Sequence, residues 1–404
     1  MPQRCVLQLV RSSFPIRHSF VIRHSSFVIL MSHVHIIAGE ISGDTHAAGL
    51  LRELKALQPY FTFSGLGGPK MREQVGDSIE NWVEKAGVVG LWEVLKHYSY
   101  FKEKMAATLA AITEQKPACV VLVDYPGFNL RLAKALRQSG YSGKIIYYIS
   151  PQVWAWKKGR VKVMAKVLDL MLCIFPFEKA FYEKSGLRTE FVGHPMVDRT
   201  VQLRRNWPRE AGLCGWFPGS RLNEVRRLFP IMLGASKIIR DAMPQARFAV
   251  SAANEVLASH MREMADAHGM PEAKKWIEVG TVYDLMQRCE AGAVASGTAT
   301  LEAACLGLPY TLVYNVSWPT YVVGKLVVKI KHLGMVNILA QREVVRELVQ
   351  HDLSVSTLAA VTLELLQDQT KREALQADLA SITTMLGSGG AYQRAAEAVH
   401  HCLS

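Results

Sequence analysis

The sequence lacks the patterns that would place it in several common classes of protein. Its seven cysteines are scattered and form no C-x-x-C pair, which fits buried structural thiols in a reducing compartment. Neither zinc-finger spacing nor a Lys/Arg tract interleaved with aromatic residues occurs, and both absences disfavour nucleic acid as a partner. No uninterrupted apolar run reaches the ~20 residues that a membrane-spanning helix needs.

The chain is nevertheless long, half apolar and basic. Its 404 residues exceed one ordinary core and predict two domains. Half of the residues are hydrophobic, so a folded globular protein is expected. Lys and Arg number 47 against 35 Asp and Glu, a net charge of +12. This excess favours anionic partners such as nucleotides, phosphorylated lipids or an acidic membrane surface.

Residues 1–30 differ from the rest of the chain. Ser13–Ile29 is a degenerate repeat of the pattern I-R-H-S-(S)-F-V. The segment is basic but has neither a clean apolar core nor a small-residue cleavage site, so it makes a poor signal peptide. We expect residues 1–30 to be an extension outside the fold, with Met31 as the physiological start. A basic surface-binding arm is the alternative.

After Met31, predicted strands and helices alternate to the end of the chain. This alternation predicts two doubly wound α/β domains, residues 31–205 and 206–369, joined by a polar linker at Arg199–Glu210. Helices in 370–404 are expected to pack back on the first domain. The predicted strands are Val34–Ala38, Phe61–Gly65, Cys119–Val123, Lys144–Tyr148, Met171–Phe175, Phe191–Gly193, Leu213–Phe217, Arg247–Ser251, Trp276–Val279, Ala291–Ala295 and Tyr310–Tyr314.

The most informative stretch follows the strand Ala291–Ala295. Ser296, Gly297 and Thr298 form a small-residue turn that opens a helix, and the unpaired N–H groups of a first helical turn attract anions. Glu302 lies near that turn and would repel a phosphate unless it aims at something neutral, such as ribose hydroxyls. The stretch suggests a nucleoside diphosphate with its sugar. Ordinary capping of the helix explains it about equally well.

Two further strand ends carry candidate groups for chemistry. Asp124 follows Cys119–Val123, and an acid at the carboxyl end of a parallel strand is a candidate general base. Arg221 follows Leu213–Phe217 and the turn containing Ser220, where a cation can neutralise a diphosphate leaving group. A turn-bracing Asp124 and a solvated Arg221 are the alternatives.

The turn after Val34–Ala38 carries three polar residues, Glu40, Ser42 and Asp44. Its glycines do not make a full G-x-G-x-x-G spacing, so a dinucleotide site is only weakly indicated. Two apolar segments with spaced lysines, Val83–Phe101 and Trp318–Val336, suit either the core or a surface that contacts acyl chains or a membrane.

Eight motifs together resemble the lipid-A-disaccharide synthase family of GT-B glycosyltransferases. The resemblance runs from about Val34 to the C-terminus and leaves residues 1–30 outside. In chain order the motifs are AGEISGD, LVDYPGFN, SPQVWAWKKGR, FPFEKAFY, FVGHPMVD, FPGSR, SGTATLE and VNILAQREVVREL.

The resemblance implies an α/β fold of GT-B type, with two doubly wound Rossmann-like domains and a cleft between them. It implies that UDP-2,3-diacylglucosamine donates its sugar to 2,3-diacylglucosamine 1-phosphate (lipid X), with inversion, to form a β-1,6-linked disaccharide 1-phosphate and UDP. It implies no cofactor and no tightly bound metal ion, in keeping with the lack of a clear D-x-D pair. An anionic membrane surface, at the cytoplasmic face of the inner membrane, is an expected partner, and a homodimer a further option.

The resemblance also assigns roles to the candidate residues. Asp124 would be the base, and Arg221 would hold the diphosphate. Glu302 would bind ribose, and Asn337, with an expected helix at Glu343–Gln350, would close on the nucleotide. Four residues would assist Arg221 in holding the diphosphate: Ser220, Ser296, Gly297 and Thr298. Three residues would line the acceptor side of the cleft: Glu40, Ser42 and Asp44.

Two positions depart from the family pattern. Many relatives have a second acid where this chain has Gly127, and a proline where it has Val336. Three rival interpretations remain. The first is another GT-B enzyme, such as a peptidoglycan lipid-intermediate glucosaminyltransferase or a UDP-sugar epimerase. The others are a non-catalytic protein that binds a nucleotide sugar or a membrane lipid, and a nucleic-acid-binding protein.

Overall fold

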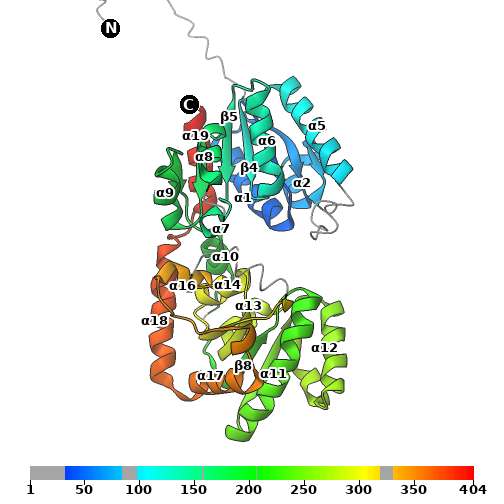
Figure 1. The fold of residues 1–404 in the computed structure, drawn as a ribbon, viewed down its shortest axis with the longest axis vertical. Helices are drawn as coiled ribbons and strands as arrows, with labels where there is room; N and C mark the ends of the chain where they lie inside the picture. Colours follow the sequence, from blue (N-terminus) through cyan, green and yellow to red (C-terminus); the bar gives the residue numbers. More distant parts are fainter. Residues whose placement is uncertain (1–31, 84–97, 157–158, 206, 319–330) are drawn as a thin grey trace, which may run out of the picture. The chain divides into compact units, whose positions relative to one another are not determined.

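The computed structural model describes residues 32–83, 98–156, 159–205, 207–318 and 331–404 (Figure 1). Most of the predicted apolar segments Val83–Phe101 and Trp318–Val336 lies outside these residues, as does the N-terminal extension. No helix in the described ranges is long and apolar enough to cross a bilayer.

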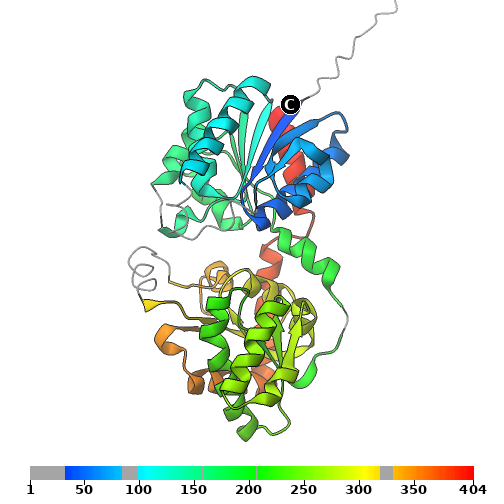
Figure 2. The same cartoon turned by 90° about the vertical axis from the view of Figure 1, so that its right-hand side faces the viewer.

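The first half of the chain builds a seven-stranded parallel sheet in the order β3-β2-β1-β4-β5-β6-β7. Its central strands are almost wholly buried, as expected where helices cover both faces (Figure 2). The strands are β1 (His33–Ala38), β2 (Thr62–Gly67), β3 (Ile79–Asn81), β4 (Cys119–Val123), β5 (Lys144–Tyr148), β6 (Leu170–Cys173) and β7 (Thr189–Phe191). The helices are α1 (Ile41–Leu57), α2 (Pro69–Val75), α5 (Tyr98–Gln115), α6 (Pro126–Gln138), α7 (Val153–Trp156), α8 (Arg160–Val167), α9 (Pro176–Glu183) and α10 (Pro195–Leu203).

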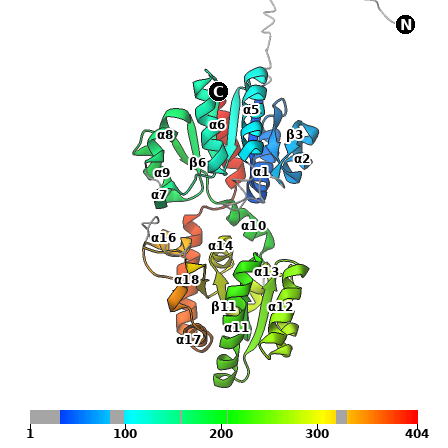
Figure 3. The same ribbon diagram turned by 45° about the vertical axis from the view of Figure 1, so that its right-hand side comes forward.

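The second half builds a six-stranded parallel sheet in the order β10-β9-β8-β11-β12-β13. Helices α12 and α18 lie on opposite flanks of this sheet (Figures 1 and 3). The strands are β8 (Glu210–Phe217), β9 (Arg247–Ala252), β10 (Ile277–Val279), β11 (Cys289–Ala295), β12 (Tyr310–Tyr314) and β13 (Glu347–Val349). The helices are α11 (Leu222–Ala242), α12 (Glu255–Ala267), α13 (Val282–Arg288), α14 (Thr298–Cys305), α16 (Met335–Ala340), α17 (Val355–Gln367), α18 (Gln369–Met385) and α19 (Ala391–Leu403).

The two sheets repeat one topology. Each begins at an inner strand, β1 or β8, runs outward to one edge, and then restarts on the other side with β4 or β11. The order of strands therefore reverses between β1 and β4 and again between β8 and β11. Open parallel sheets bind ligands at the carboxyl ends of the strands beside such a reversal. Each half of the chain thus has one expected ligand-binding edge.

The two helices at the C-terminus pack against different halves. Helix α18 contacts α14 and α16, whereas α19 contacts α1, β5 and β6. A Cβ atom at Gly49 of α1 would lie 2.5 Å from the ring of Tyr392 in α19, so the close approach of these helices requires glycine there. Asp198 of α10 accepts hydrogen bonds from the N–H groups of Gly390 and Ala391, which fixes the start of α19.

The structures predicted for two segments were wrong. Residues 343–350 do not form a helix, because β13 begins at Glu347, and the preceding N–H groups of Val344 and Val345 are bound by the side chain of Asn337. Arg199–Glu210 is not a plain linker. Its start belongs to α10, its end belongs to β8, and the guanidinium of Arg209 donates to main-chain carbonyls of the second half.

Candidate functional site

The carboxyl ends of β1 and β4 lie side by side, because Ala38 pairs with Val123 in parallel register. The chain leaves these strands through Gly39 and Glu40 on one side and Asp124 and Tyr125 on the other. A Cβ atom at Gly39 would lie 2.2 Å from Cδ1 of Tyr125. Only glycine at position 39 therefore allows the two turns to come this close.

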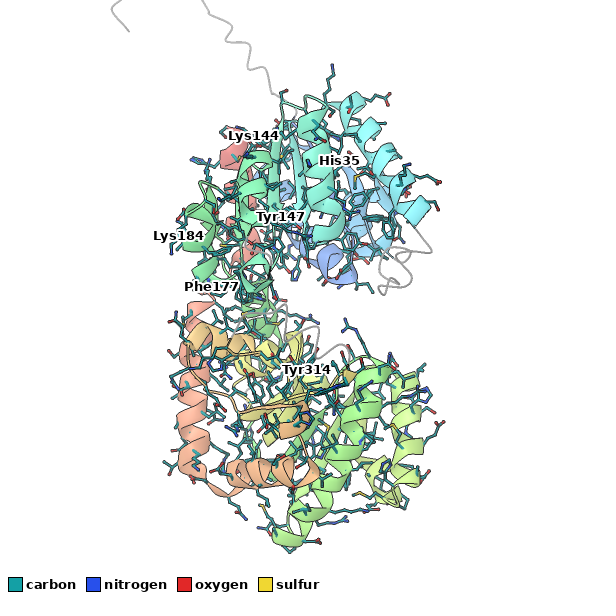
Figure 4. The ribbon with its side chains drawn as sticks, viewed as in Figure 1. His35, Lys144, Tyr147, Phe177, Lys184 and Tyr314 are labelled. Atoms are coloured by element: carbon teal, nitrogen blue, oxygen red, sulfur yellow. The ribbon has the colours of Figure 1, made fainter. Side chains whose placement is uncertain are left out.

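Asp124 is held by its main chain in a conformation that few residues adopt. Its φ angle is 48° and that of Tyr125 is 49°, so two consecutive non-glycine residues are left-handed. The main-chain oxygen of Asp124 accepts hydrogen bonds from Asn129 Nδ2 at 2.7 Å and from the hydroxyl of Tyr147 at 2.5 Å. Figure 4 shows Tyr147 among the side chains of the first sheet. Backbone strain of this kind persists where surrounding contacts enforce it, and it is common at functional sites.

The environment of Asp124 suits a base that works near neutral pH. The pKa of its carboxyl is raised from 3.8 to about 6, because burial and, to a smaller extent, the negative charge of Glu40 raise it more than the hydrogen bond from the main-chain N–H of Tyr125 lowers it. At pH 7 most molecules would carry the ionised form. A carboxylate with this pKa can both take a proton and remain available to do so.

The three polar residues after β1 have different settings. Glu40 and Ser42 are exposed at the start of α1. Asp44 is buried, and its carboxylate accepts hydrogen bonds from the N–H groups of Gly68 at 2.7 Å and Met71 at 3.1 Å, at the start of α2. The main-chain N–H of Lys70 donates a third hydrogen bond to the carboxylate of Asp44, at 3.0 Å. Asp44 thus fixes α2 to α1 by satisfying its unpaired N–H groups.

The ends of β8 and β11 are also neighbours, since Phe217 pairs with Val294. The turn after β8 contains Ser220 and Arg221, and that after β11 contains Ser296, Gly297 and Thr298. Both turns lead directly into a helix, α11 or α14. Two helix N-termini therefore start at the same edge of the sheet, where their N–H groups favour anions.

The side chains of these turns are accessible. Ser220, Gly297 and Thr298 are exposed, and the side chain of Arg221 is 82% exposed. The guanidinium of Arg221 forms an ion pair with the carboxylate of Glu224, with Nη1 3.2 Å from Oε1. Its guanidinium can therefore turn toward a ligand. Tyr314, labelled in Figure 4, is the last residue of β12, the strand next to β11.

Glu302 and Asn337 are buried. The carboxylate of Glu302 accepts a hydrogen bond from the hydroxyl of Tyr283 at 2.7 Å. The amide of Asn337 donates to Val345 O and Glu347 Oε1, and its oxygen accepts from two main-chain N–H groups. Four bonds saturate an amide. A direct bond from Asn337 to a nucleotide would therefore require one of them to break.

Sequence reasoning missed several residues that shape these edges. Glu178 is fully buried and accepts hydrogen bonds from Trp154 Nε1 at 3.0 Å and Phe175 N–H at 3.2 Å. These bonds fix the SPQVWAW loop after β5, the strand beside β4, and burial raises the pKa of Glu178 to about 7. The FPFEKAFY motif contains Glu178, but no spacing in it indicates Trp154 as the partner.

No group of three or more His, Cys, Asp and Glu side chains in the described part of the chain could hold a metal ion. The six cysteines in that part are all free and buried.

Comparison with known proteins agrees with the predicted resemblance. Residues 34–401 match a family model described as lipid-A-disaccharide synthetase. The lipid-A-disaccharide synthase of Geobacter metallireducens is 41% identical over 371 residues, which cover 90% of this chain and 95% of that protein. The enzyme of the same name from Geobacter sulfurreducens is 39% identical over 374 residues, with the same coverage.

Two solved structures share the fold at low sequence identity. Staphylococcus aureus MnaA, in a co-structure with UDP, superposes with a TM-score of 0.60 at 12% identity, over 92% of this chain and 96% of that one. A glycotransferase of kitacinnamycin superposes with a TM-score of 0.57 at 14% identity, over 92% and 99%. These likenesses confirm the predicted GT-B type of fold.

Proposed function

Because this chain belongs to the lipid-A-disaccharide synthase family, a family of hexosyltransferases in lipid A biosynthesis, we propose that it joins UDP-2,3-diacylglucosamine to lipid X. The products are a β-1,6-linked disaccharide 1-phosphate and UDP. The observation that carries this proposal is the placement of complementary groups at the two strand reversals. A carboxyl with a near-neutral pKa lies at one, and an exposed arginine beside two helix N-termini lies at the other.

Asp124 is the proposed base. The 6-hydroxyl oxygen of lipid X attacks C1 of the donor sugar, its proton passes to the carboxylate of Asp124, and the bond between C1 and the diphosphate oxygen breaks. A single displacement turns the α-linked donor into a β-linked product, so the reaction inverts the anomeric centre. Asn129 and Tyr147 hold the main chain of Asp124 so that the carboxylate keeps a fixed direction.

Arg221 is the proposed group for the diphosphate of the donor. Its guanidinium can exchange Glu224 for phosphate oxygens and form two parallel hydrogen bonds with them. Ser220, Ser296 and Thr298 add hydroxyl donors, and the open backbone at Gly297, with a φ angle of 150°, allows close approach. These groups offset the charge that develops on UDP as it leaves, so the proposed transfer requires no metal ion.

The acceptor side of the proposed site begins at Glu40 and Ser42, which are exposed at the start of α1, and the charge of Glu40 acts on Asp124. Asp44 supports that side through its bonds to α2. We further propose that the protein works at the cytoplasmic face of the inner membrane, since both substrates are anionic lipids and the chain carries a net charge of +12.

The structure of the product tests this proposal. We expect the purified protein, supplied with both substrates in detergent, to form a disaccharide linked through O6 of lipid X, in which the NMR coupling at C1 of the donor sugar shows the β configuration. An α linkage would contradict a single displacement by the 6-hydroxyl of lipid X with Asp124 as base. The fold is shared with UDP-N-acetylglucosamine 2-epimerases, so the same reaction without lipid X serves as the control. Interconversion of the UDP-sugar there would favour an epimerase.

A further inference from the structure

The carboxylate of Glu302 is held on one of its two oxygens. Tyr283 of α13 donates its hydroxyl to Oε1 at 2.7 Å, and Nη1 of Arg199 in α10 lies 3.9 Å from the same atom. Within the described ranges, Oε2 accepts no hydrogen bond. One oxygen is therefore committed to the protein, and the other keeps its capacity to accept.

Arg199 also contacts Tyr283 directly. The central carbon of its guanidinium lies 4.9 Å from the centre of the Tyr283 ring, a distance typical of a cation–π contact. The side chain of Glu302 is 10% exposed and that of Arg199 is 54% exposed. We call Arg199, Tyr283 and Glu302 together the Glu302 clamp. It compensates a mostly buried negative charge and fixes the direction of its carboxylate.

The helices that carry the Glu302 clamp are themselves tied together. Gln287, one turn after Tyr283 in α13, accepts the N–H of Arg205 at 2.6 Å and donates to the carbonyl of Leu203 at the end of α10. Helix α14, which carries Glu302, contacts both α10 and α13, and the three lie together in Figure 3. The Glu302 clamp is therefore carried by helices that hydrogen bonds and packing hold together.

We propose that Tyr283 and Arg199 are positioning residues that present Oε2 of Glu302 to a ribose hydroxyl of the bound nucleotide. This inference rests on the proposed function, together with the role at the donor ribose that the family resemblance implies for Glu302. An unclamped carboxylate near two helix N-termini could rotate toward them and meet the diphosphate with the wrong sign of charge. The clamp instead occupies Oε1 and leaves only Oε2 for a neutral donor. Its consequence is selectivity for ribose over deoxyribose.

Affinities for UDP, 2′-deoxy-UDP and 3′-deoxy-UDP test the inference by calorimetry. The native protein is expected to bind UDP more tightly than at least one of the deoxy analogues. Tyr283→Phe should weaken UDP by about fivefold to tenfold, as for loss of a hydrogen bond to a charged group, and leave that deoxy analogue nearly unchanged. Arg199→Gln should weaken UDP about twofold to threefold, because its ion pair is half exposed and long.

Two matched controls separate positioning from general damage. Tyr141→Phe removes a tyrosine hydroxyl that donates to Pro117 O in the first half, and Arg240→Gln removes an exposed ion pair with Glu272 at the far end of α11. Both should leave all three affinities unchanged. Thermal unfolding of every variant confirms that it is folded.

Glu302→Ala distinguishes the possible failures, because alanine has no side-chain acceptor for a ribose hydroxyl. If this variant binds UDP like the native protein, Glu302 does not contact the nucleotide, and both its proposed role and the inference are wrong. If Glu302→Ala loses ribose selectivity while Tyr283→Phe and Arg199→Gln keep it, Glu302 is a ligand but the positioning role is overturned. Equal weakening of UDP and both deoxy analogues in Tyr283→Phe would likewise overturn it, since a purely structural hydroxyl has no preference among them.

Discussion

Replacing Asp124 with Asn should reduce turnover by about 10²–10⁴-fold and at the same time stabilise the protein. Asn resembles the protonated carboxyl in size and tolerates the left-handed backbone of this position. The rise of the Asp124 pKa from 3.8 to about 6 means that its ionised form is disfavoured in the folded protein. At about 1.36 kcal/mol for each pKa unit, the ionised carboxylate costs about 3 kcal/mol of folding stability.

The sign of this effect fixes its dependence on pH. A carboxyl with a raised pKa contributes stability below its unfolded pKa of about 4, and that stability is lost as the pH rises through about 6. Asn cannot ionise, so a protein with Asn at position 124 does not lose this stability as the pH rises. Asp124→Asn should therefore gain about 1.5 kcal/mol over the native protein at pH 5 and about 3 kcal/mol at pH 7.5.

Urea unfolding of both proteins at pH 5 and pH 7.5 measures this difference. Asp77→Asn, in which the lost carboxylate is 93% exposed, serves as the control, and we expect a change within about 0.5 kcal/mol at either pH. A difference between Asp124→Asn and the native protein that stays constant with pH would refute the raised pKa. Retained sugar transfer by Asp124→Asn would refute the role of Asp124 as base.

Three further changes have expected outcomes. Glu40→Gln removes a negative charge that raises the Asp124 pKa, so the acid limb of the pH–rate profile should move to lower pH, and an unmoved limb would contradict this. Arg221→Ala should raise the dissociation constant of UDP about tenfold or more but leave that of uridine unchanged, as calorimetry can show. Gly39→Ala should cost about 1–3 kcal/mol in unfolding experiments, because its Cβ would lie 2.2 Å from the ring of Tyr125. Wild-type stability of that variant would mean that the two turns are not in contact.

The sequence was sufficient for the elements that carry strong local signals. The buried strands Cys119–Val123, Lys144–Tyr148 and Tyr310–Tyr314 have the predicted bounds, because their runs of β-branched and aromatic residues are short and continuous. The turns that follow such strands could be located from small and polar residues. The positions of Asp124 and Arg221 at strand ends follow from this pattern.

Contacts between residues far apart in the sequence determine the features that local sequence patterns did not predict. The edge strand β13 is only three residues long, and side chains of Asn337 and Glu347 hold the chain around it. Asp44 is predicted at the acceptor side, and no local pattern indicates that its carboxylate accepts hydrogen bonds from main-chain N–H groups 24 to 27 residues away. The hydroxyl of Tyr283 meets Glu302 across 19 residues of sequence, and no local pattern predicts that pairing.

UDP release from UDP-2,3-diacylglucosamine, with and without lipid X and in the presence of EDTA, tests the central claim most directly. The native protein should release UDP only when lipid X is present, EDTA should not slow it, and Asp124→Asn should release about 10²–10⁴-fold less. Equal release without lipid X would indicate hydrolysis of the donor. Tight binding of the donor with no release would contradict sugar transfer.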